Sequence, residues 1–113
     1  MGDMVQQMMP GNYGNRANGE AKGTGFYGEI PMTNGSGKIM TEVGSNVTMD
    51  GGRDFHFPLI HQNSTAADIA HLASGKSATP EMVKTAVAVA LERVRGGKSA
   101  FWQQGEPVLP MPK

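Results

Sequence analysis

Residues 79–97, TPEMVKTAVAVALERVRGG, carry the clearest structural pattern in the chain. Thr79 is a typical helix N-cap, and the proline and glutamate after it suit a first helical turn, where proline needs no N–H partner and an acid meets the positive end of the helix dipole. The two glycines at the end of the stretch stop a helix. We therefore predict a helix here and expect one apolar face at helical spacing to pack on the core: Val83, Val87, Ala90, Leu91 and Val94.

A second, shorter helix is predicted just before the first one. Thr65 and Asp68 stand three residues apart, as the hydroxyl and the carboxylate of a capping box do. Ile69 and Leu72 form a short apolar stripe, and Gly75 ends it. We expect this helix to be about ten residues long.

Alternation of apolar and polar residues predicts strands before these helices. The alternation covers residues 38–43, 46–49 and 54–57. Gly44-Ser45 and Asp50-Gly51-Gly52 separate the three runs, and their glycines supply the positive φ angles of tight hairpin turns. The predicted fold is α+β: a small three-stranded antiparallel β-meander packed on two α-helices, with an extended N-terminal arm and a Pro-rich C-terminal tail.

The first third of the chain has a different composition. Eight of the 16 glycines lie in residues 11–37, so ordering this segment costs much conformational entropy. The segment nevertheless carries too many apolar side chains for a solvated linker. Two alternatives follow, because the arm can wrap over its own core or lie on a neighbouring subunit. In the second case the partner-binding residues are Met4, Met8, Met9, Tyr13, Phe26, Tyr27 and Ile30.

These patterns divide the chain into three parts. Residues 1–37 form the Gly/Asn/Met-rich arm, residues 38–104 form the small α+β domain, and residues 105–113 form an extended tail. The tail contains three prolines, which cannot continue a helix. Phe101 and Trp102 precede the tail and are expected to anchor it on the helix pair.

Charge and composition narrow the classes of function. Ten Lys and Arg residues balance ten Asp and Glu residues, so no net charge draws the chain to nucleic acid or to an anionic membrane. The chain has no cysteine, which excludes a disulfide framework, a Cys-ligated zinc site and a thiol nucleophile. No apolar run approaches the ~20 residues of a membrane span, and the N-terminus lacks the pattern of a signal peptide. We expect no direct contact with nucleic acid and no membrane span.

Motifs of phosphate-binding sites occur only in unsuitable contexts. Gly23, Gly25 and Gly28 have the spacing of a dinucleotide-binding fingerprint, but no predicted strand precedes them and no predicted helix follows. Gly75-Lys76-Ser77 and Gly97-Lys98-Ser99 lack the first glycine of a phosphate-binding loop. Both also follow a predicted helix, whose C-terminal dipole repels phosphate. We therefore expect no cofactor.

The three histidines, His56, His61 and His71, show no metal-binding or catalytic spacing. No two of them are four residues apart on one predicted helix, and His56 alternates with two phenylalanines along a predicted strand. We predict no metal site and no catalytic residue, and we expect a protein that is not an enzyme.

Five segments of the chain share short motifs with one known module. They are Gly35–Glu42, Val47–Gly51, Phe57–Ile60, Ala73–Glu81 and Lys98–Trp102. Together they resemble a small module of tailed bacteriophages, which occurs as standalone proteins and as segments of large internal virion proteins. The resemblance covers roughly residues 25 to 104 and leaves the methionine-rich arm and the proline tail outside it.

The resemblance implies a virion component, assembled in the host cytoplasm and bound to the capsid, portal or tail. Its partners would be other virion proteins, present in multiple symmetric copies. An alternative from another class is a non-catalytic binding domain accessory to a peptidoglycan hydrolase or other ejected virion enzyme, and an exposed aromatic patch at Phe101 and Trp102 would favour it. A third is an enzyme with a histidine-centred site at His61 or His71.

Overall fold

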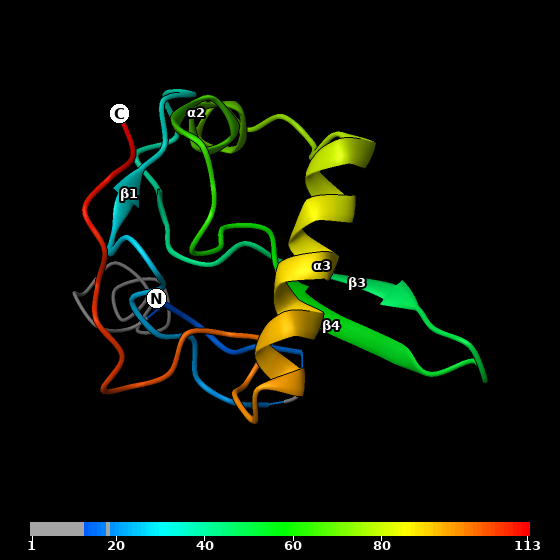
Figure 1. The fold of residues 1–113 in the computed structure, drawn as a ribbon. Coiled ribbons are helices and arrows are strands. Elements are labelled where there is room, and N and C mark those ends of the chain that lie inside the picture. Colours follow the sequence, from blue (N-terminus) through cyan, green and yellow to red (C-terminus); the bar gives the residue numbers. More distant parts are fainter. Residues whose placement is uncertain (1–12, 18) are drawn as a thin grey trace.

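The computed structural model describes residues 13–17 and 19–113, and predictions for residues 1–12 lie outside this range. The described chain is an α+β protein with two helices and two small antiparallel sheets (Figure 1). The elements in chain order are β1 (Ile30–Pro31), β2 (Ile39–Met40), β3 (Gly44–Thr48), β4 (Asp54–Pro58), α2 (Ala66–Ala73) and α3 (Pro80–Arg95).

The predicted three-stranded meander is wrong, because its first strand pairs elsewhere. β2 pairs with β1, with Ile30 opposite Met40, and among the described strands β3 pairs only with β4. Gly44 and Ser45 do not form the expected turn but begin β3. The chain leaves β2 through Val43, whose φ of 51° is left-handed and interrupts an extended strand. Two separate sheets are the result.

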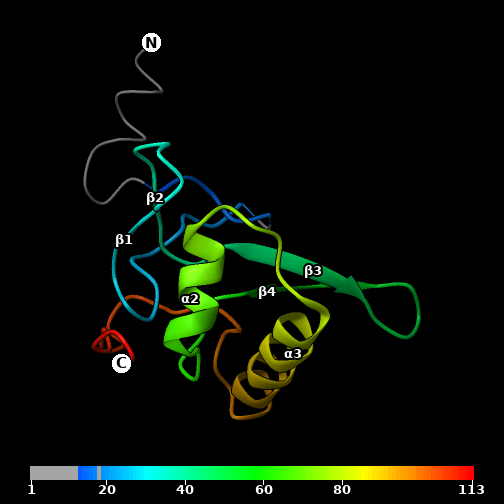
Figure 2. The same cartoon turned by 90° about the horizontal axis from the view of Figure 1, so that it is seen from above.

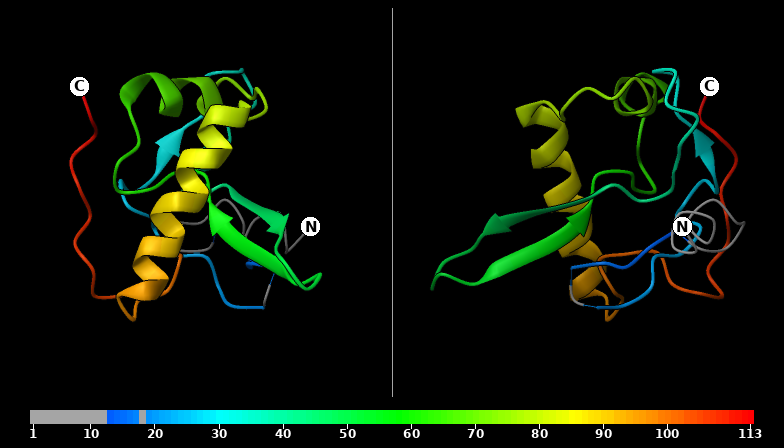
Figure 3. Two further views of the ribbon diagram at one scale, coloured as in Figure 1. Left: turned by 45° about the vertical axis from the view of Figure 1, so that its right-hand side comes forward. Right: turned by 180° about the vertical axis from the view of Figure 1, so that it is seen from behind.

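The second predicted turn is confirmed and closes a projecting hairpin. Gly51 and Gly52 have positive φ angles, and the Gly52 N–H donates to the carbonyl of Met49 at 3.0 Å. β3 and β4 pair over their full length, from Gly44 opposite Pro58 to Thr48 opposite Asp54. Figure 1 and both views of Figure 3 show the tip of this hairpin extending beyond α3 and away from the rest of the molecule.

Both predicted helices are confirmed together with their caps. The Thr65 hydroxyl accepts from the N–H of Asp68 at 3.1 Å, and the Thr79 hydroxyl accepts from the N–H of Met82 at 3.1 Å. Thr65 and Thr79 are extended, as N-caps require. Figure 1 shows α2 end-on at the top of the molecule, while α3 runs down one side of it. Figure 2 shows both helices from above.

The face of α3 that packs on the core matches the predicted one in part. The buried residues of α3 are Met82, Ala86, Ala90 and Arg93. Of the predicted stripe, only Ala90 is buried, and Val94 is 47% exposed. Ala86 and Ala90 belong to one hydrophobic cluster with Phe57 of β4, and the half-buried Val83 and Val87 pack against the same cluster. Of the predicted stripe, Val94 is the exposed member.

Two hydrophobic clusters form the core. One gathers the glycine-rich segment, β2, α2, the start of α3 and Trp102; its members are Phe26, Tyr27, Ile30, Met40, Ile60, Ile69, Leu72, Ala73, Met82 and Trp102. The other joins β4 to the middle of α3 and to the segment after it; its members are Phe57, Ala86, Ala90, Ala100 and Phe101. Phe26, Tyr27 and Ile30 of the predicted arm therefore belong to the core.

Candidate functional site

Two buried arginines organise the polar interior of the protein, and Arg16 is the first. Its Nε donates to Glu42 Oε1 at 3.0 Å, and its Nη2 donates to Glu42 Oε2 at 2.5 Å. The two side chains are 5% and 1% exposed. Glu42 Oε2 also accepts from the N–H of Gly23 at 3.1 Å. This two-point geometry is the strong form of a buried ion pair.

The pair also fixes the segment that precedes the tail. Arg16 Nη2 donates to the carbonyl of Trp102 at 2.8 Å, and the guanidinium lies 4.7 Å from the centre of the Phe101 ring. The hydrogen bond to Glu42 raises the pKa of Arg16, and burial opposes this effect. Arg16 therefore stays charged, and its guanidinium interacts with Glu42, the Trp102 carbonyl and the Phe101 ring of the same chain.

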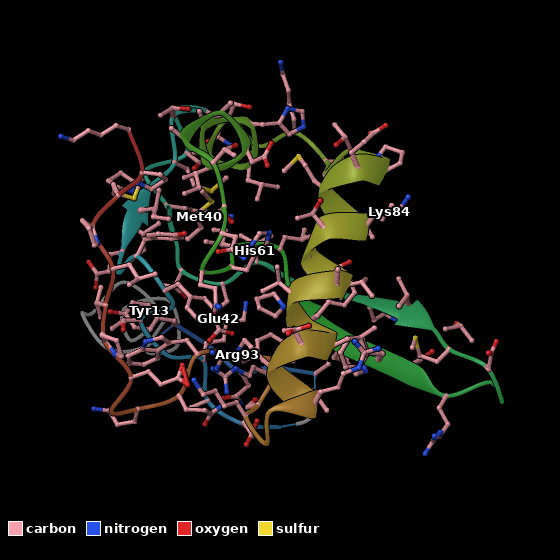
Figure 4. All side chains as sticks on the ribbon, in the orientation of Figure 1. Tyr13, Met40, Glu42, His61, Lys84 and Arg93 are labelled. Carbon is pink, nitrogen blue, oxygen red and sulfur yellow. The ribbon has the colours of Figure 1, made fainter. Side chains whose placement is uncertain are left out.

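Arg93 of α3 binds the same segment from the other side. Its Nη2 donates to the carbonyl of Phe101 at 3.0 Å, and its Nε donates to the carbonyl of Ser99 at 2.8 Å. Glu106 pairs with Nη2 at 2.8 Å, and the guanidinium lies 4.9 Å from the centre of the Phe26 ring. Figure 4 shows Arg93 and Glu42 pointing into the lower half of the molecule. The two arginines thus tie the arm, α3 and the tail together.

A polar cavity of about 250 Å³ lies beside Arg16. Arg16 and Glu42 reach it but are already paired with each other. The other polar side chains that line it are Asn15, Lys22, Ser45, Asn46 and His56. An acid, a base and a hydroxyl therefore border this cavity, but the acid, Glu42, is bound to Arg16.

The histidines lie apart from one another. His61 is 4% exposed, and its Nδ1 accepts from the N–H of Asn63 at 3.1 Å. Burial lowers the pKa of His61, and the charge of Asp68 opposes this effect. His71 Nε2 lies 2.6 Å from the carbonyl oxygen of Ser77. Across residues 13–17 and 19–113, no three His, Cys, Asp or Glu side chains are grouped as metal ligands.

The glycines of the apparent dinucleotide fingerprint have packing roles. A Cβ on Gly25, whose φ is +76°, would overlap the carbonyl of Thr41. A Cβ on Gly23 would come within 2.7 Å of the Trp102 ring. These positions let the arm approach β2 and the tryptophan closely. The arm residues around them form neither a helix nor the strand that a fingerprint requires.

An apolar groove between β3 and the first half of α3 is the larger open surface feature. It encloses about 520 Å³. Its lining is apolar apart from the exposed Lys84, which Figure 4 labels on the outer side of α3. The lining residues are Val47, Ala78, Pro80, Val83, Lys84 and Val87. This groove is suited to bind a chain segment with apolar side chains.

The structure separates the predicted partner-binding residues into three groups. Phe26, Tyr27 and Ile30 are 4%, 8% and 5% exposed and belong to the chain's own core, as in the alternative in which the arm covers its own body. Tyr13 is half-buried, and its hydroxyl donates to Glu29 Oε2 at 2.6 Å. The methionines at positions 4, 8 and 9 lie outside the described residues, and their role stays a prediction.

The predicted tail anchor has contacts on both of its residues. Phe101 and Trp102 are 6% and 5% exposed, and Trp102 packs in the cluster that contains the α2 residues. The indole N–H of Trp102 donates to the carbonyl of Pro107 at 3.2 Å, and the N–H of Leu109 donates to the carbonyl of Phe26 at 2.6 Å. The anchor therefore holds the tail against the arm.

Sequence reasoning missed Arg16, Glu42 and Arg93. In the sequence, Arg93 is one of two arginines near the end of a predicted helix, and Glu42 is a polar residue in the alternating run 38–43. Their burial depends on partners far away in the sequence, since Arg16 and Glu42 are 26 positions apart. No periodicity or short motif carries that information.

Comparison with known proteins yields no relative: no family model, no curated protein and no solved structure matches the chain. Among the described residues, no helix combines the length and the apolar character needed to cross a membrane.

Proposed function

We propose that this protein is a non-catalytic structural or accessory component of a bacteriophage particle, bound to the capsid, portal or tail through neighbouring subunits. The resemblance to a module of tailed bacteriophages supports the phage assignment. The surface of the folded body supports a role in binding other chains.

The observation that carries the proposal is the projecting β3–β4 hairpin with the groove beside it. Within the part of the chain that the structure describes, each strand of the hairpin pairs only with the other. Unpaired strand edges bind further strands readily, and proteins that stay monomeric usually cover or shorten them. Val47 of β3 and Val83 of α3 present apolar surface next to this free edge. A neighbouring subunit could pair with the free strand edge and fill the groove.

No specific observation favours the accessory domain of a peptidoglycan hydrolase. An exposed aromatic patch at Phe101 and Trp102 would favour that alternative, but both side chains are buried. No specific observation favours the enzyme with a site centred on His61 or His71 either. The two histidines take part in separate local hydrogen bonds.

Mass spectrometry of purified particles tests the proposal. Particles from the strain that carries the gene are banded on a density gradient, and the chain is quantified against the major capsid protein. We expect it to co-band with the particles at a fixed, symmetry-compatible copy number that survives a salt wash. A chain that remains in the soluble lysate fraction while particles band without it would refute the proposal.

A further inference from the structure

The polar cavity beside Arg16 gathers side chains that have no partner in the described part of the chain. It has a volume of about 250 Å³ and is lined by residues of the arm and of the hairpin. Five of its lining side chains make no hydrogen bond or ion pair with described residues: Asn15, Lys22, Ser45, Asn46 and His56. Each of them can donate a hydrogen bond, and unpaired donors that converge on one cavity are typical of a ligand site.

We propose that this cavity binds a phosphate group, either free or carried by a small molecule. The inference goes beyond the proposed function, because it assigns a ligand to the folded body and does not depend on a neighbouring subunit. It is also separate from the glycine-rich motifs of the sequence, since none of their glycines lines the cavity.

The backbone brings these side chains to the cavity from two parts of the chain. Asn46 of β3 lies directly opposite His56 of β4 in the hairpin register, so both stand on the same face of the sheet. On the arm, a β-bridge at Asn15 and a hydrogen bond of 2.9 Å from the N–H of Lys22 to the carbonyl of Gly14 bring Asn15 and Lys22 near each other. Figures 1 and 2 show this part of the arm, drawn in blue, beside the end of the hairpin that joins the body. The arm and the hairpin therefore both supply donors to the cavity.

The charges of the lining favour an anion. Glu42 is the acid of the lining, and Arg16 binds both of its carboxylate oxygens. Glu20 pairs with Arg16 from outside the lining and is 54% exposed, so water weakens its influence. Lys22 is half-buried and has no counter-charge among the described residues. A bound anion would supply that counter-charge through a charge-assisted hydrogen bond.

A phosphate matches this set of donors better than a carboxylate does. A carboxylate presents two oxygens in one plane, whereas a phosphate group presents at least three acceptor oxygens that point in different directions. The cavity offers an ammonium, a hydroxyl, an imidazole and two amide groups, so a carboxylate would leave more of them unpaired. The volume of about 250 Å³ is below the roughly 300 Å³ at which pockets for drug-sized ligands begin, and it suits one small anionic group.

NMR titration of the full-length ¹⁵N-labelled chain with sodium phosphate tests the inference. Sodium chloride keeps the ionic strength constant, so general screening of charges does not change during the titration. We expect saturable shifts at residues 15, 22, 45, 46 and 56, with a dissociation constant of about 1 mM or tighter, which lies within the limit on binding energy per atom for so small a ligand.

Two further ligands identify the chemistry. Glycerol 3-phosphate carries the phosphate on a small molecule, and binding that is tighter than that of inorganic phosphate would assign the site to phosphate esters. Tighter binding of inorganic phosphate would assign it to the free ion. Succinate tests the carboxylate class and should bind at least about fivefold more weakly than phosphate, because it leaves donors unpaired.

Variants of Lys22 test its charge. Lys22→Gln should weaken phosphate binding about tenfold or more, because it removes a hydrogen bond from a charged donor. Lys22→Arg keeps the charge and should bind phosphate more tightly than Lys22→Gln does. Lys76→Gln is the matched control, since Lys76 is exposed and does not line the cavity, and it should bind like the wild type.

Several outcomes would overturn the inference. They are an absence of shifts, shifts that do not saturate, shifts as large at Lys76 and Lys98 as at the cavity, and succinate binding as tight as phosphate binding. If Lys22→Gln does not fold, the titration of the wild type decides the question by itself, because the residues that should shift are specified in advance. A chain that co-bands with particles but binds no phosphate would refute this inference and leave the proposed function standing.

Discussion

Arg16 and Glu42 form an ion pair with almost no exposed surface, at 5% and 1% of the two side chains. Removing one partner of such a pair leaves an uncompensated charge in the interior. Glu42→Gln is therefore expected to lower the free energy of unfolding by about 3 kcal/mol or more, as measured by urea denaturation. The glutamine keeps the size of the side chain but cannot neutralise Arg16.

Glu20→Gln is the matched control, because Glu20 also pairs with Arg16 but is 54% exposed. Exposed ion pairs contribute little, so this change should cost less than about 1 kcal/mol. Equal losses in the two variants would show that the burial of Glu42 has no energetic consequence.

His61 makes stability depend on pH below neutrality. Its pKa in the folded protein lies below the usual 6.5, mainly because burial disfavours the charged ring. Below pH 6.5 the unfolded chain binds a proton that the folded chain does not, so the free energy of unfolding should fall as the pH drops from 6.5 towards the folded pKa. Urea denaturation at pH 7.5 and at pH 5.5 measures this loss.

The variant His61→Gln should reduce the difference between the two pH values. A pH dependence that persists in full in His61→Gln would assign it to another group.

At the scale of elements, Val43 separates β2 from β3. A β-branched residue with a φ of 51° is strained, and glycine adopts this conformation without that cost. Val43→Gly gains this relief while losing a half-buried side chain, so its net effect on stability should be within about 1 kcal/mol.

Val47→Gly in β3 provides the comparison, because Val47 is also half-buried but has no positive φ. It should cost at least about 1 kcal/mol more than Val43→Gly, measured as a difference in urea midpoints at equal slope. A larger loss in Val43→Gly would indicate that its side chain outweighs the backbone strain.

For the whole molecule, the tail joins parts of the chain that are far apart in sequence. Glu106 pairs with Arg93, the carbonyl of Pro107 accepts from Trp102, and the N–H of Leu109 donates to Phe26. Truncation after Gln104 removes all three contacts and should lower the free energy of unfolding by roughly 2–4 kcal/mol. Thermal and urea unfolding measure the change.

Truncation after Pro110 is the matched control. It removes three residues but keeps these contacts, so the loss should stay within about 0.5 kcal/mol. If both truncations have the same effect, the contacts of Glu106 and Leu109 are not what stabilises the tail.

The helices and the hairpin turn were predictable because their signals are local. Thr65 and Thr79 cap helices with their own neighbours, and Gly51 and Gly52 turn the chain within a few residues. The pairing of β2 was not predictable in this way, since it depends on β1 in the glycine-rich segment. Of the candidate site, the apolar stripe with Val83 and Val87 was predictable from helical spacing, but the groove that they form with Val47 was not.

The α+β class, the two helices with their caps, and the turn of the projecting hairpin follow from local sequence, because each depends on residues close together in the chain. Long-range packing sets which residues of α3 are buried, brings Phe26 and Tyr27 into the core, and pairs Arg16 with Glu42. These outcomes depend on which distant surfaces pack with the least empty space and leave the fewest unpaired charges. That balance is settled by the whole molecule and not by any single segment of it.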